Sequence, residues 1–378
     1  MSIIKTENEE VVFNETFFND LPPHKNIETV AIMRQVIKSS RALSELDNKA
    51  ARLPNQDILI SNMALSEAKD SSAIENIVTT NDLLYKADVT PEENVDPMTK
   101  EVRDYNKALW LGIDLITRKP LGENIFVQLV QTIKHNTAGL RKTPGTVIKN
   151  MKTGEILHVP PQTEMGIKAK LANLEKFLYE KNYNEIDPLI KMAIMHYQFE
   201  CIHPFNDGNG RTGRIANILW LVQEGLLHRP ILFLSKYYLE HRSEYYERLK
   251  RVTQKEEWEE WILYVLKSVE ETAKNTSLMI DKILRARNQY KDELFKYFRK
   301  ISSSDLVDVV FSSPYFRIEN FLDKIPTYSR QTASKHLNML CQPYDREDGT
   351  KGQLLTVQKV GRENIYFNQI LFEILSRN

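Results

Sequence analysis

Apolar residues recur at intervals of three and four positions through most of this 378-residue chain. That interval places apolar side chains along one face of an α-helix. A clear example follows Arg214, where Ile215, Ile218, Leu219 and Val222 occupy positions i, i+3, i+4 and i+7. Glycine, which weakens helices, contributes only 13 residues. A mainly helical fold with a bundled core is therefore expected, with helical segments at 29–51, 58–77, 99–116, 123–137, 164–181, 187–202, 214–227 and 261–301.

Two stretches depart from the helical pattern. Residues 141–161 open with Pro-Gly, contain two β-prone runs around Lys-Thr-Gly and close with Pro-Pro, which predicts a β-hairpin. Two strands alone are marginally stable, so this hairpin needs a surface to lie over. Near the C-terminus, three short helical segments precede a β-prone one, at 304–311, 317–325, 329–340 and 352–368. Three helices and a β-wing predict a winged helix-turn-helix domain.

Charge and cysteine content argue against several classes of protein. Lys and Arg number 51, as do Asp and Glu, so no net charge steers the whole chain to nucleic acid or to a membrane surface. Cys201 and Cys341 lie far apart in the sequence, which argues against a disulfide framework and favours a reducing compartment. The N-terminus lacks a signal-peptide core, and no run of about 18 apolar residues occurs. A cytoplasmic protein without membrane association is expected.

Residues 203–214, His-Pro-Phe-Asn-Asp-Gly-Asn-Gly-Arg-Thr-Gly-Arg, gather polar residues and glycines between two predicted helices. Their glycines fit the pattern Gly-x-Gly-x-x-Gly. However, a dinucleotide site needs a buried strand before that pattern, and residues 187–202 have helical spacing. Another kind of anion site fits better. Gly208 and Gly210 let backbone N–H groups converge at the start of the next helix, whose positive end attracts phosphate.

Four side chains would complete this anion site. Arg211 and Arg214 lie three positions apart on one helical face, and each can bind a phosphate with two hydrogen bonds. Asp207 offers a hard oxygen ligand, which Mg²⁺ takes together with phosphate oxygens and water. His203, with an unperturbed pKa of about 6.5, suits proton abstraction near neutral pH. Together they indicate phosphoryl or nucleotidyl transfer rather than a polar turn with solvated arginines, and Phe205 is expected to anchor the loop in the core.

Residues 203–214 resemble the signature of the Fic family, His-Pro-Phe-x-Asp/Glu-Gly-Asn-Gly-Arg-x-x-Arg, at every fixed position. The resemblance implies a Fic helical bundle with a β-hairpin flap that transfers AMP from ATP to a Ser, Thr or Tyr hydroxyl of a protein. It implies that His203 deprotonates that hydroxyl and that Asp207 holds Mg²⁺. The other fixed positions would bind the ATP phosphates, through the backbone at Gly208, Asn209 and Gly210 and the side chains of Arg211 and Arg214.

The resemblance extends to two flanking segments. The hairpin at 141–161 matches the flap on which Fic proteins align a target segment by strand addition. Residues 241–249 are similar to the stretch that walls the adenosine, which makes Tyr245 a candidate nucleotide contact. The alternative is that Tyr245 and Tyr246 are core aromatics. Some relatives carry an Asn eight residues after the first tyrosine, and this chain has Thr253 there.

Residues 71–76, Ser-Ser-Ala-Ile-Glu-Asn, are similar to the family's inhibitory helix, Ser/Thr-x-x-x-Glu-Gly/Asn. Ser71, Glu75 and Asn76 fill its fixed positions. A Glu75 carboxylate at the ATP site, paired with Arg214, would withdraw the arginine that orients the γ-phosphate. Some relatives also use this glutamate to remove AMP, and the alternatives of brake and hydrolase stay open. The implied domains are an N-terminal helical region with the inhibitory helix, the Fic catalytic core, and a linker helix with the winged helix-turn-helix, at 1–110, 111–285 and 286–378.

The partners implied by these features are ATP as substrate, Mg²⁺, and a protein target that bears the acceptor hydroxyl. That target could be the chain itself, and a homodimer is open. DNA binding is open as well, because residues 303–378 carry nine Lys and Arg against nine Asp and Glu, whereas DNA-binding domains are usually basic. The alternatives are a nucleotide-sensing transcriptional regulator, transfer of another nucleotide or of phosphocholine, and a Doc-like protein kinase. Doc-like relatives carry Lys at the position of Gly210, which argues against the last.

Overall fold

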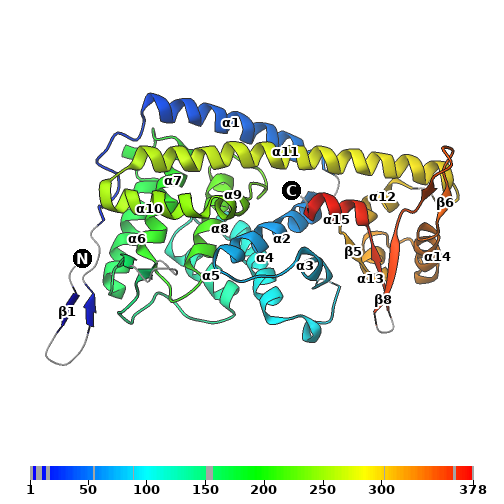
Figure 1. The fold of residues 1–378 in the computed structure, drawn as a ribbon, viewed down its shortest axis with the longest axis horizontal. Coiled ribbons are helices and arrows are strands. Elements are labelled where there is room, and N and C mark those ends of the chain that lie inside the picture. Colours follow the sequence, from blue (N-terminus) through cyan, green and yellow to red (C-terminus); the bar gives the residue numbers. More distant parts are fainter. Residues whose placement is uncertain are drawn as a thin grey trace. The chain divides into compact units, whose positions relative to one another are not determined.

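The computed structural model describes residues 3–5, 11–13, 18–53, 56–87, 89–149, 156–301, 303–360 and 363–376. The described chain is mainly helical, as predicted (Figure 1). It divides into two compact units, each assembled from several stretches. We call them the first unit, with Met1–Ser44, Asp70–Ile77 and Asp104–Ala273, and the second unit, with Glu45–Lys69, Val78–Arg103 and Lys274–Asn378. The three domain boundaries expected from the sequence stay a prediction.

Two helices that are buried on nearly every side form the centre of the first unit. These are α7 (Pro188–Ile202) and α8 (Asn209–Gln223), which pack against each other, with α6 (Glu164–Tyr179) on α7 and α5 (Glu123–Lys134) on α8. Their apolar residues are buried together with polar ones such as His196 of α7 and Asn217 of α8, as expected of helices at the centre of a bundle. The remaining elements of the unit include α9 (Ser235–Glu240), α10 (Arg242–Lys255), η2 (Lys181–Tyr183), β1 (Ile3–Lys5) and β2 (Val11–Phe13).

Four longer helices contribute residues to both units. They are α1 (Val30–Ala50), α2 (Gln56–Ile74), α4 (Pro97–Ile116) and α11 (Trp258–Tyr297). The helical segment expected at 261–301 is a single helix, α11, which begins three residues earlier and ends at Tyr297. Among the described residues, no helix is both long enough and apolar enough to cross a lipid bilayer.

The predicted hairpin is present in the first unit. β3 (Ile148–Lys149) pairs antiparallel with β4 (Ile156–His158), with Ile148 opposite His158 and an irregular register at Lys149. The part of the predicted hairpin at 150–155 lies outside the described residues. The surface that such a short ribbon needs is supplied in part by α10, which packs against β4.

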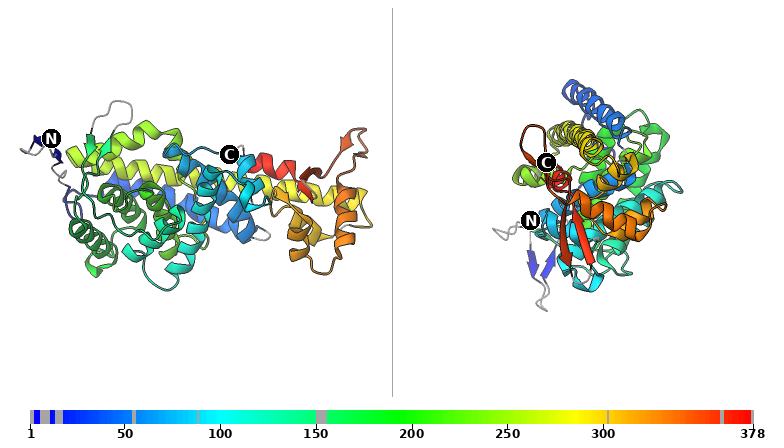
Figure 2. Two further views of the ribbon diagram at one scale, coloured as in Figure 1. Left: turned by 90° about the horizontal axis from the view of Figure 1, so that it is seen from below. Right: turned by 90° about the vertical axis from the view of Figure 1, so that its right-hand side faces the viewer.

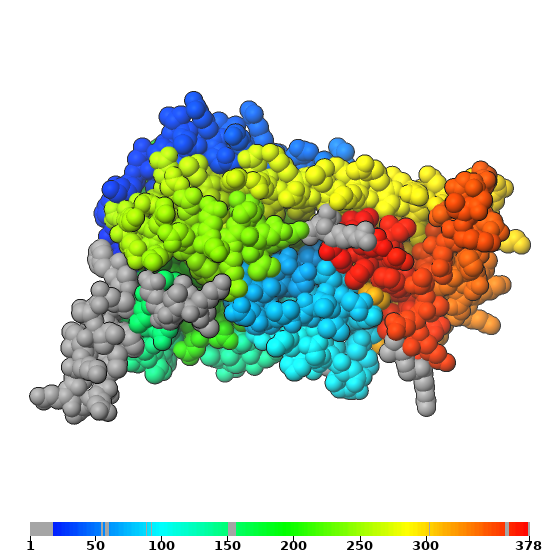
Figure 3. All heavy atoms as spheres, viewed as in Figure 1, coloured from blue at the N-terminus to red at the C-terminus, as the bar shows by residue number. Residues whose placement is uncertain are grey.

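The second unit ends in the element order of a winged helix-turn-helix. Three short helices precede the wing, whose strands lie side by side in the right view of Figure 2 and close a three-stranded antiparallel sheet in the order β5-β9-β8. In Figure 3 the orange and red atoms of this region form exposed surface. Its elements are α12 (Ser304–Val310), α13 (Ile318–Lys324), α14 (Arg330–Leu340), α15 (Gln369–Ser376), β5 (Tyr315–Phe316), β6 (Tyr344–Asp345), β7 (Lys351–Gly352), β8 (Thr356–Val360) and β9 (Glu363–Phe367). Earlier in the chain the unit also holds α3 (Asn81–Ala87) and η1 (Glu92–Asn94).

Candidate functional site

The loop between α7 and α8 is held in a defined shape by its own residues. His203 ends α7 in the left-handed region, with φ of 48°, and its N–H donates to the Phe199 carbonyl at 3.0 Å. Gly208 is also left-handed, with φ of 81°, which glycine adopts without a steric penalty, and α8 begins at the next residue. The Asn209 side chain closes the loop, because it accepts from the Phe205 N–H at 2.8 Å and donates to the Phe205 carbonyl at 2.7 Å. Asn209 is therefore the first residue of α8 and also stabilises the loop through both hydrogen bonds of its side chain.

The half-buried His203 imidazole lies at this loop beside a cavity. Burial, followed by the charge of the Arg141 guanidinium, lowers the pKa of His203 to about 4, although the backbone of Glu200 and the charge of Glu75 oppose the shift. An imidazole with such a pKa is neutral at pH 7 and can accept a proton. The side chain predicted as the base is therefore in the protonation state that a base requires.

The start of α8 presents backbone rather than side chains to this cavity. At Gly210 an added Cβ would overlap the Glu75 carboxylate and would lie 2.8 Å from the Arg214 guanidinium. A larger residue at position 210 would therefore displace one of the two. The first N–H groups of a helix have no intrahelical partner and attract anions. Here the Glu75 carboxylate lies beside Gly210 in this first turn.

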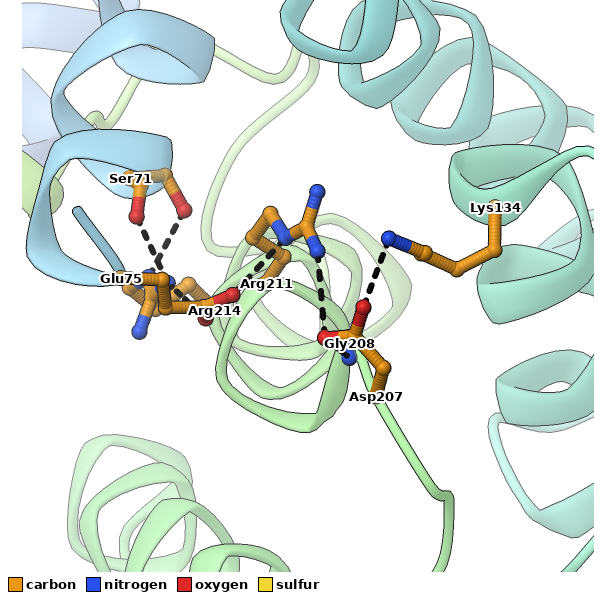
Figure 4. A network of polar contacts seen from close by, with 7 residues as sticks. All are labelled: Ser71, Glu75, Lys134, Asp207, Gly208, Arg211 and Arg214. Atoms are coloured by element: carbon orange, nitrogen blue, oxygen red, sulfur yellow. Dashed lines mark hydrogen bonds and ion pairs between the residues drawn. The ribbon is translucent and has the colours of Figure 1, made fainter. Parts of the chain in front are cut away.

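Glu75 links the two arginines of the motif (Figure 4). Its Oε1 accepts from Arg214 Nη2 at 2.7 Å, and its Oε2 accepts from Arg211 Nε at 2.9 Å. Arg214 also donates from Nε to Ser71 Oγ at 2.7 Å and from Nη2 to the Ser71 carbonyl at 2.8 Å. The sequence suggested only the contact with Arg214. The structure shows that the Glu75 carboxylate accepts hydrogen bonds from both arginines and that Ser71 accepts from Arg214.

The chain of charges continues on the other side of Arg211. Arg211 Nη2 lies 3.5 Å from Asp207 Oδ1, and Lys134 Nζ lies 2.6 Å from Asp207 Oδ2. Burial acts to raise the pKa of Asp207, but the hydrogen bond and charge of Lys134 outweigh it and hold that pKa below its usual range. Asp207 is thus a carboxylate with one oxygen toward each cation. We call the whole set the arginine network: Ser71, Glu75, Lys134, Asp207, Arg211 and Arg214.

The other two predicted residues lie at the edges of the site. Asn76 follows α2 with φ of 64°, and its Oδ1 accepts from Arg242 Nη1 at 3.3 Å. Tyr245 is only 2 % exposed and hydrogen-bonds through its Oη to His196 Nε2 at 2.9 Å, although it also lines the cavity. Tyr246, its more exposed neighbour, lines the same cavity and lies under the Arg242 guanidinium.

A cavity of about 310 Å³ connects these features. Its lining brings together the end of α2, the flap, the motif loop and α10, which are distant in sequence. Predicted residues in the lining are Glu75, His203, Asp207, Gly208, Asn209, Gly210, Arg214 and Tyr245. Other lining residues include Ile148, Leu157 and His158 of the flap, Glu200 of α7, and Thr253 of α10. The cavity therefore has an anion-attracting end at α8 and an aromatic side at α10.

Four residues near the site were not identified from the sequence: Lys134, Arg141, His158 and Glu200. Lys134 and Arg141 flank the start of the flap, and a charge beside a predicted hairpin is too common a pattern to single out. Glu200 carried a usable signal, because it is the one carboxylate within the apolar run 188–202. Burial raises its pKa to about 7, with Arg214 acting against the shift and Glu75 with it.

Among the described residues, no group of three or more His, Cys, Asp or Glu side chains could hold a metal ion. Asp207 is the carboxylate of the motif that faces the cavity. Magnesium is commonly held by one or two protein carboxylates together with substrate phosphates and water. A single exposed carboxylate next to a phosphate-attracting helix start fits that ion, provided that the ion replaces Lys134 as the partner of Asp207 Oδ2.

Comparison with known families accounts for most of the chain. Residues 33–114 match the family described as "Fic/DOC family N-terminal", and residues 120–221 match "Fic/DOC family". Residues 287–371 match "Protein adenylyltransferase SoFic-like, C-terminal domain".

Individual relatives resemble parts of the chain. It is 28% identical over 224 residues to a protein adenylyltransferase Fic of Drosophila mojavensis, covering 56% of this chain and 42% of that one. It is 36% identical over 80 residues to protein adenylyltransferase fic-1 of Caenorhabditis briggsae, covering 21% and 15%. A crystal structure of a Fic family protein from Desulfovibrio desulfuricans has a TM-score of 0.57 at 18% identity, covering 92% of this chain and 98% of that one, and shows a shared fold. The chain spans less than half the length of these curated relatives.

Proposed function

The chain belongs to the Fic/DOC family, and from this premise we propose that it is a protein adenylyltransferase. It transfers AMP from ATP to a Ser, Thr or Tyr hydroxyl of a protein. The observation that carries the proposal is that the neutral His203 and the start of α8 line one cavity. A base and an anion site in one cavity are what such a transfer requires.

In this reaction His203 takes the proton of the acceptor hydroxyl. The hydroxyl oxygen then forms a bond to the α-phosphorus of ATP, and the bond from that phosphorus to the oxygen bridging to the β-phosphorus breaks. Pyrophosphate leaves with the electron pair. The backbone N–H groups at the start of α8 are preorganised to stabilise the negative charge on the phosphates. Arg211 and Arg214 are within reach of the same region once Glu75 leaves them.

Asp207 is the residue that would hold Mg²⁺. Its carboxylate is exposed at the cavity, and the low pKa of Asp207 keeps it ionised at neutral pH. The ion would neutralise charge on the phosphate oxygens. Lys134 holds one oxygen of Asp207 in the structure, so this lysine would turn toward a phosphate when the carboxylate takes the ion.

We further propose that Glu75 restrains the enzyme. Its carboxylate occupies both arginines and lies over Gly210, where the phosphates would bind. A bound triphosphate has to displace this carboxylate or accept a misplaced α-phosphate. The same carboxylate could instead orient a water for removal of AMP. Incubating AMP-modified protein with wild type and with Glu75→Gln tests this second activity, which requires faster loss of AMP with wild type.

The acceptor we propose is a protein segment that pairs with the flap edge, and self-modification is the first case to assay. Homodimer formation and DNA binding by the C-terminal domain stay predictions. A reducing, cytoplasmic location is supported by the two free, buried cysteines Cys201 and Cys341.

The test uses ATP labelled at the α- or at the γ-phosphate, with wild type, Glu75→Gly and His203→Ala. We expect protein-bound label only from the α-position, more of it with Glu75→Gly, and none above background with His203→Ala. Label from the γ-position alone would identify a kinase. Equal labelling by His203→Ala and wild type would refute the role of the base.

A further inference from the structure

We propose that Arg141 is a positioning residue that fixes the catalytic base and joins it to the flap. The inference rests on the proposed function, because it assigns Arg141 a part in the same reaction. Arg141 is only 2 % exposed and is the first residue of the flap segment 141–161, ahead of strand β3. Its guanidinium donates to backbone carbonyl groups, and Arg141 does not belong to the cavity lining described above, unlike most of the residues proposed to bind ATP.

Arg141 and one flap residue satisfy the carbonyl groups at the end of α7. The last carbonyls of a helix have no intrahelical partner and need donors from elsewhere. Here four consecutive carbonyls, of residues 201–204, accept hydrogen bonds from the segment 141–158. His158 Nε2 lies 2.8 Å from the Cys201 carbonyl. Arg141 donates from Nη2 to Ile202 at 3.5 Å, from Nε to His203 at 2.8 Å and from its backbone N–H to Pro204 at 2.9 Å.

These contacts bear directly on the base. His203 is a left-handed non-glycine residue, a conformation that costs free energy and persists only when its surroundings hold it. The hydrogen bond from Arg141 Nε to the His203 carbonyl fixes the peptide that follows the base. The ring position of a base decides whether it reaches the acceptor hydroxyl, so a small displacement has a large effect on rate.

The same guanidinium also holds the far end of the flap. Arg141 Nη2 donates to the Pro161 carbonyl, which follows β4. Gln162 closes the base of the flap, because its Oε1 accepts from the Gly145 N–H at 2.6 Å and its Nε2 donates to the Thr146 carbonyl at 2.9 Å. A target strand that pairs with the flap therefore acts on an element that shares one side chain with the base. Through its hydrogen bonds to the His203 and Pro161 carbonyls, Arg141 couples the position of the base to that of the flap.

Arginine suits this position better than lysine does. A guanidinium presents five donors in a planar fork, and here it reaches three carbonyls that lie in different directions. A lysine would keep the charge and lose most of these bonds. The charge has a separate effect, since Arg141 lowers the pKa of His203. The other groups that influence the pKa of this imidazole are the Glu75 carboxylate and the backbone of Glu200, which raise it, and His158, which lowers it.

The effect of the Arg141 hydrogen bonds and the effect of its charge can be separated by two substitutions in a Glu75→Gly parent. We expect Arg141→Lys to lower kcat by about 10- to 100-fold, with KM for ATP within about threefold and the acid limb of the pH profile unchanged. We expect Arg141→Met to lower kcat at least as much and to move the acid limb to higher pH, because a positive charge beside the imidazole is gone. The matched control is Arg248→Met on α10, whose guanidinium pairs with Glu244 and Glu260, and it should retain the parent values.

A folded Arg141→Met enzyme with kcat within about twofold of the parent, or with the same acid limb, would overturn the inference. If Arg141→Met does not fold, full kcat in Arg141→Lys overturns it, since that variant lacks the fork. Titration of His203 by NMR in wild type and Arg141→Met requires no activity. A Glu75→Gly parent that transfers no AMP, together with a raised His203 pKa in Arg141→Met, would refute the proposed function and leave the positioning contacts supported.

Discussion

The arginine network and the winged helix both contain arginine–glutamate pairs, but the pairs differ in burial. Arg211 and Arg214 have side chains that are 0% and 3% exposed, and they share one carboxylate that comes from a distant part of the sequence. In the winged helix the Arg330 side chain is 62% exposed and pairs with Glu319 of the preceding helix. A buried guanidinium without a partner strongly destabilises the folded state, whereas water solvates an exposed guanidinium whether or not it has a partner. The first arrangement is therefore a buried ion-pair network, for which we propose a role in binding phosphate, and the second is an exposed surface pair.

The largest difference should appear in activity when each glutamate is removed. Glu75→Gly frees both buried arginines for the phosphates, so we expect AMP transfer to rise on the order of 100-fold. Glu319→Gly should leave the rate unchanged, because that pair lies outside the site. The measurement is incorporation of α-labelled ATP at saturating ATP. A Glu75→Gly rate equal to wild type would refute the proposal that Glu75 inhibits transfer. Glu75 and Glu319 would then be alike in having no effect on the rate.

A second contrast concerns stability. Arg214→Ala leaves the Glu75 carboxylate and the buried Ser71 hydroxyl without their main partner, so we expect a loss of about 3 kcal/mol in the free energy of unfolding. Arg330→Ala removes an exposed pair and should cost under about 1 kcal/mol. Urea unfolding of the two variants measures both values. Similar losses would mean that burial does not distinguish the two regions.

A carboxyl group that interacts with the arginine network, Glu200, and one in the winged helix, Glu319, should make stability respond to pH with opposite signs. The pKa of Glu200 is raised to about 7 from its ordinary value of 4.5, so between these values the folded state keeps a proton that the unfolded state has lost. The free energy of unfolding therefore falls as pH rises through this window, by about 3 kcal/mol, and stays level above it. Glu200→Gln should abolish this term and gain stability relative to wild type between pH 5 and pH 8.

Glu319 should make the free energy of unfolding change with pH in the opposite direction. Its hydrogen bond with Arg330 lowers the pKa of Glu319, so that contribution is present above the unfolded pKa and is lost as pH falls through the folded one. Glu319→Gln should therefore lose a little stability relative to wild type at pH 8 and none at low pH. Thermal melts of both variants at pH 5 and pH 8 test the signs. A Glu200→Gln difference that does not grow with pH would show that Glu200 is ionised in the folded chain.

The sequence predicted those parts of the molecule that depend on local pattern. Apolar spacing predicted the helices, Pro-Gly and Pro-Pro predicted the hairpin, and the Fic signature predicted the loop at which α7 ends and α8 begins. The contacts of Lys134 and Arg141 could not be found in this way. Arg141 and His203 are 62 positions apart, and nothing local to either residue indicates the other. The predicted role of Tyr245 stays a prediction, because a tyrosine that is both buried and part of the lining fits a core residue and a nucleotide contact equally.

The smallest expected effect separates the two serines that contact these regions. Ser71 Oγ accepts from Arg214 Nε, but the Ser71 carbonyl and Glu75 hold the same guanidinium, so Ser71→Ala should weaken the brake only in part. We expect AMP transfer to rise by about two- to fivefold, which corresponds to the loss of one hydrogen bond among several. Ser329 caps α14 by accepting from the Thr332 N–H at 3.1 Å, and Ser329→Ala should cost about 1 kcal/mol of stability with no change in transfer. If Ser71→Ala leaves the rate as it is, the Ser71 hydroxyl contributes nothing to the brake, and Glu75 and the Ser71 carbonyl hold Arg214 without it.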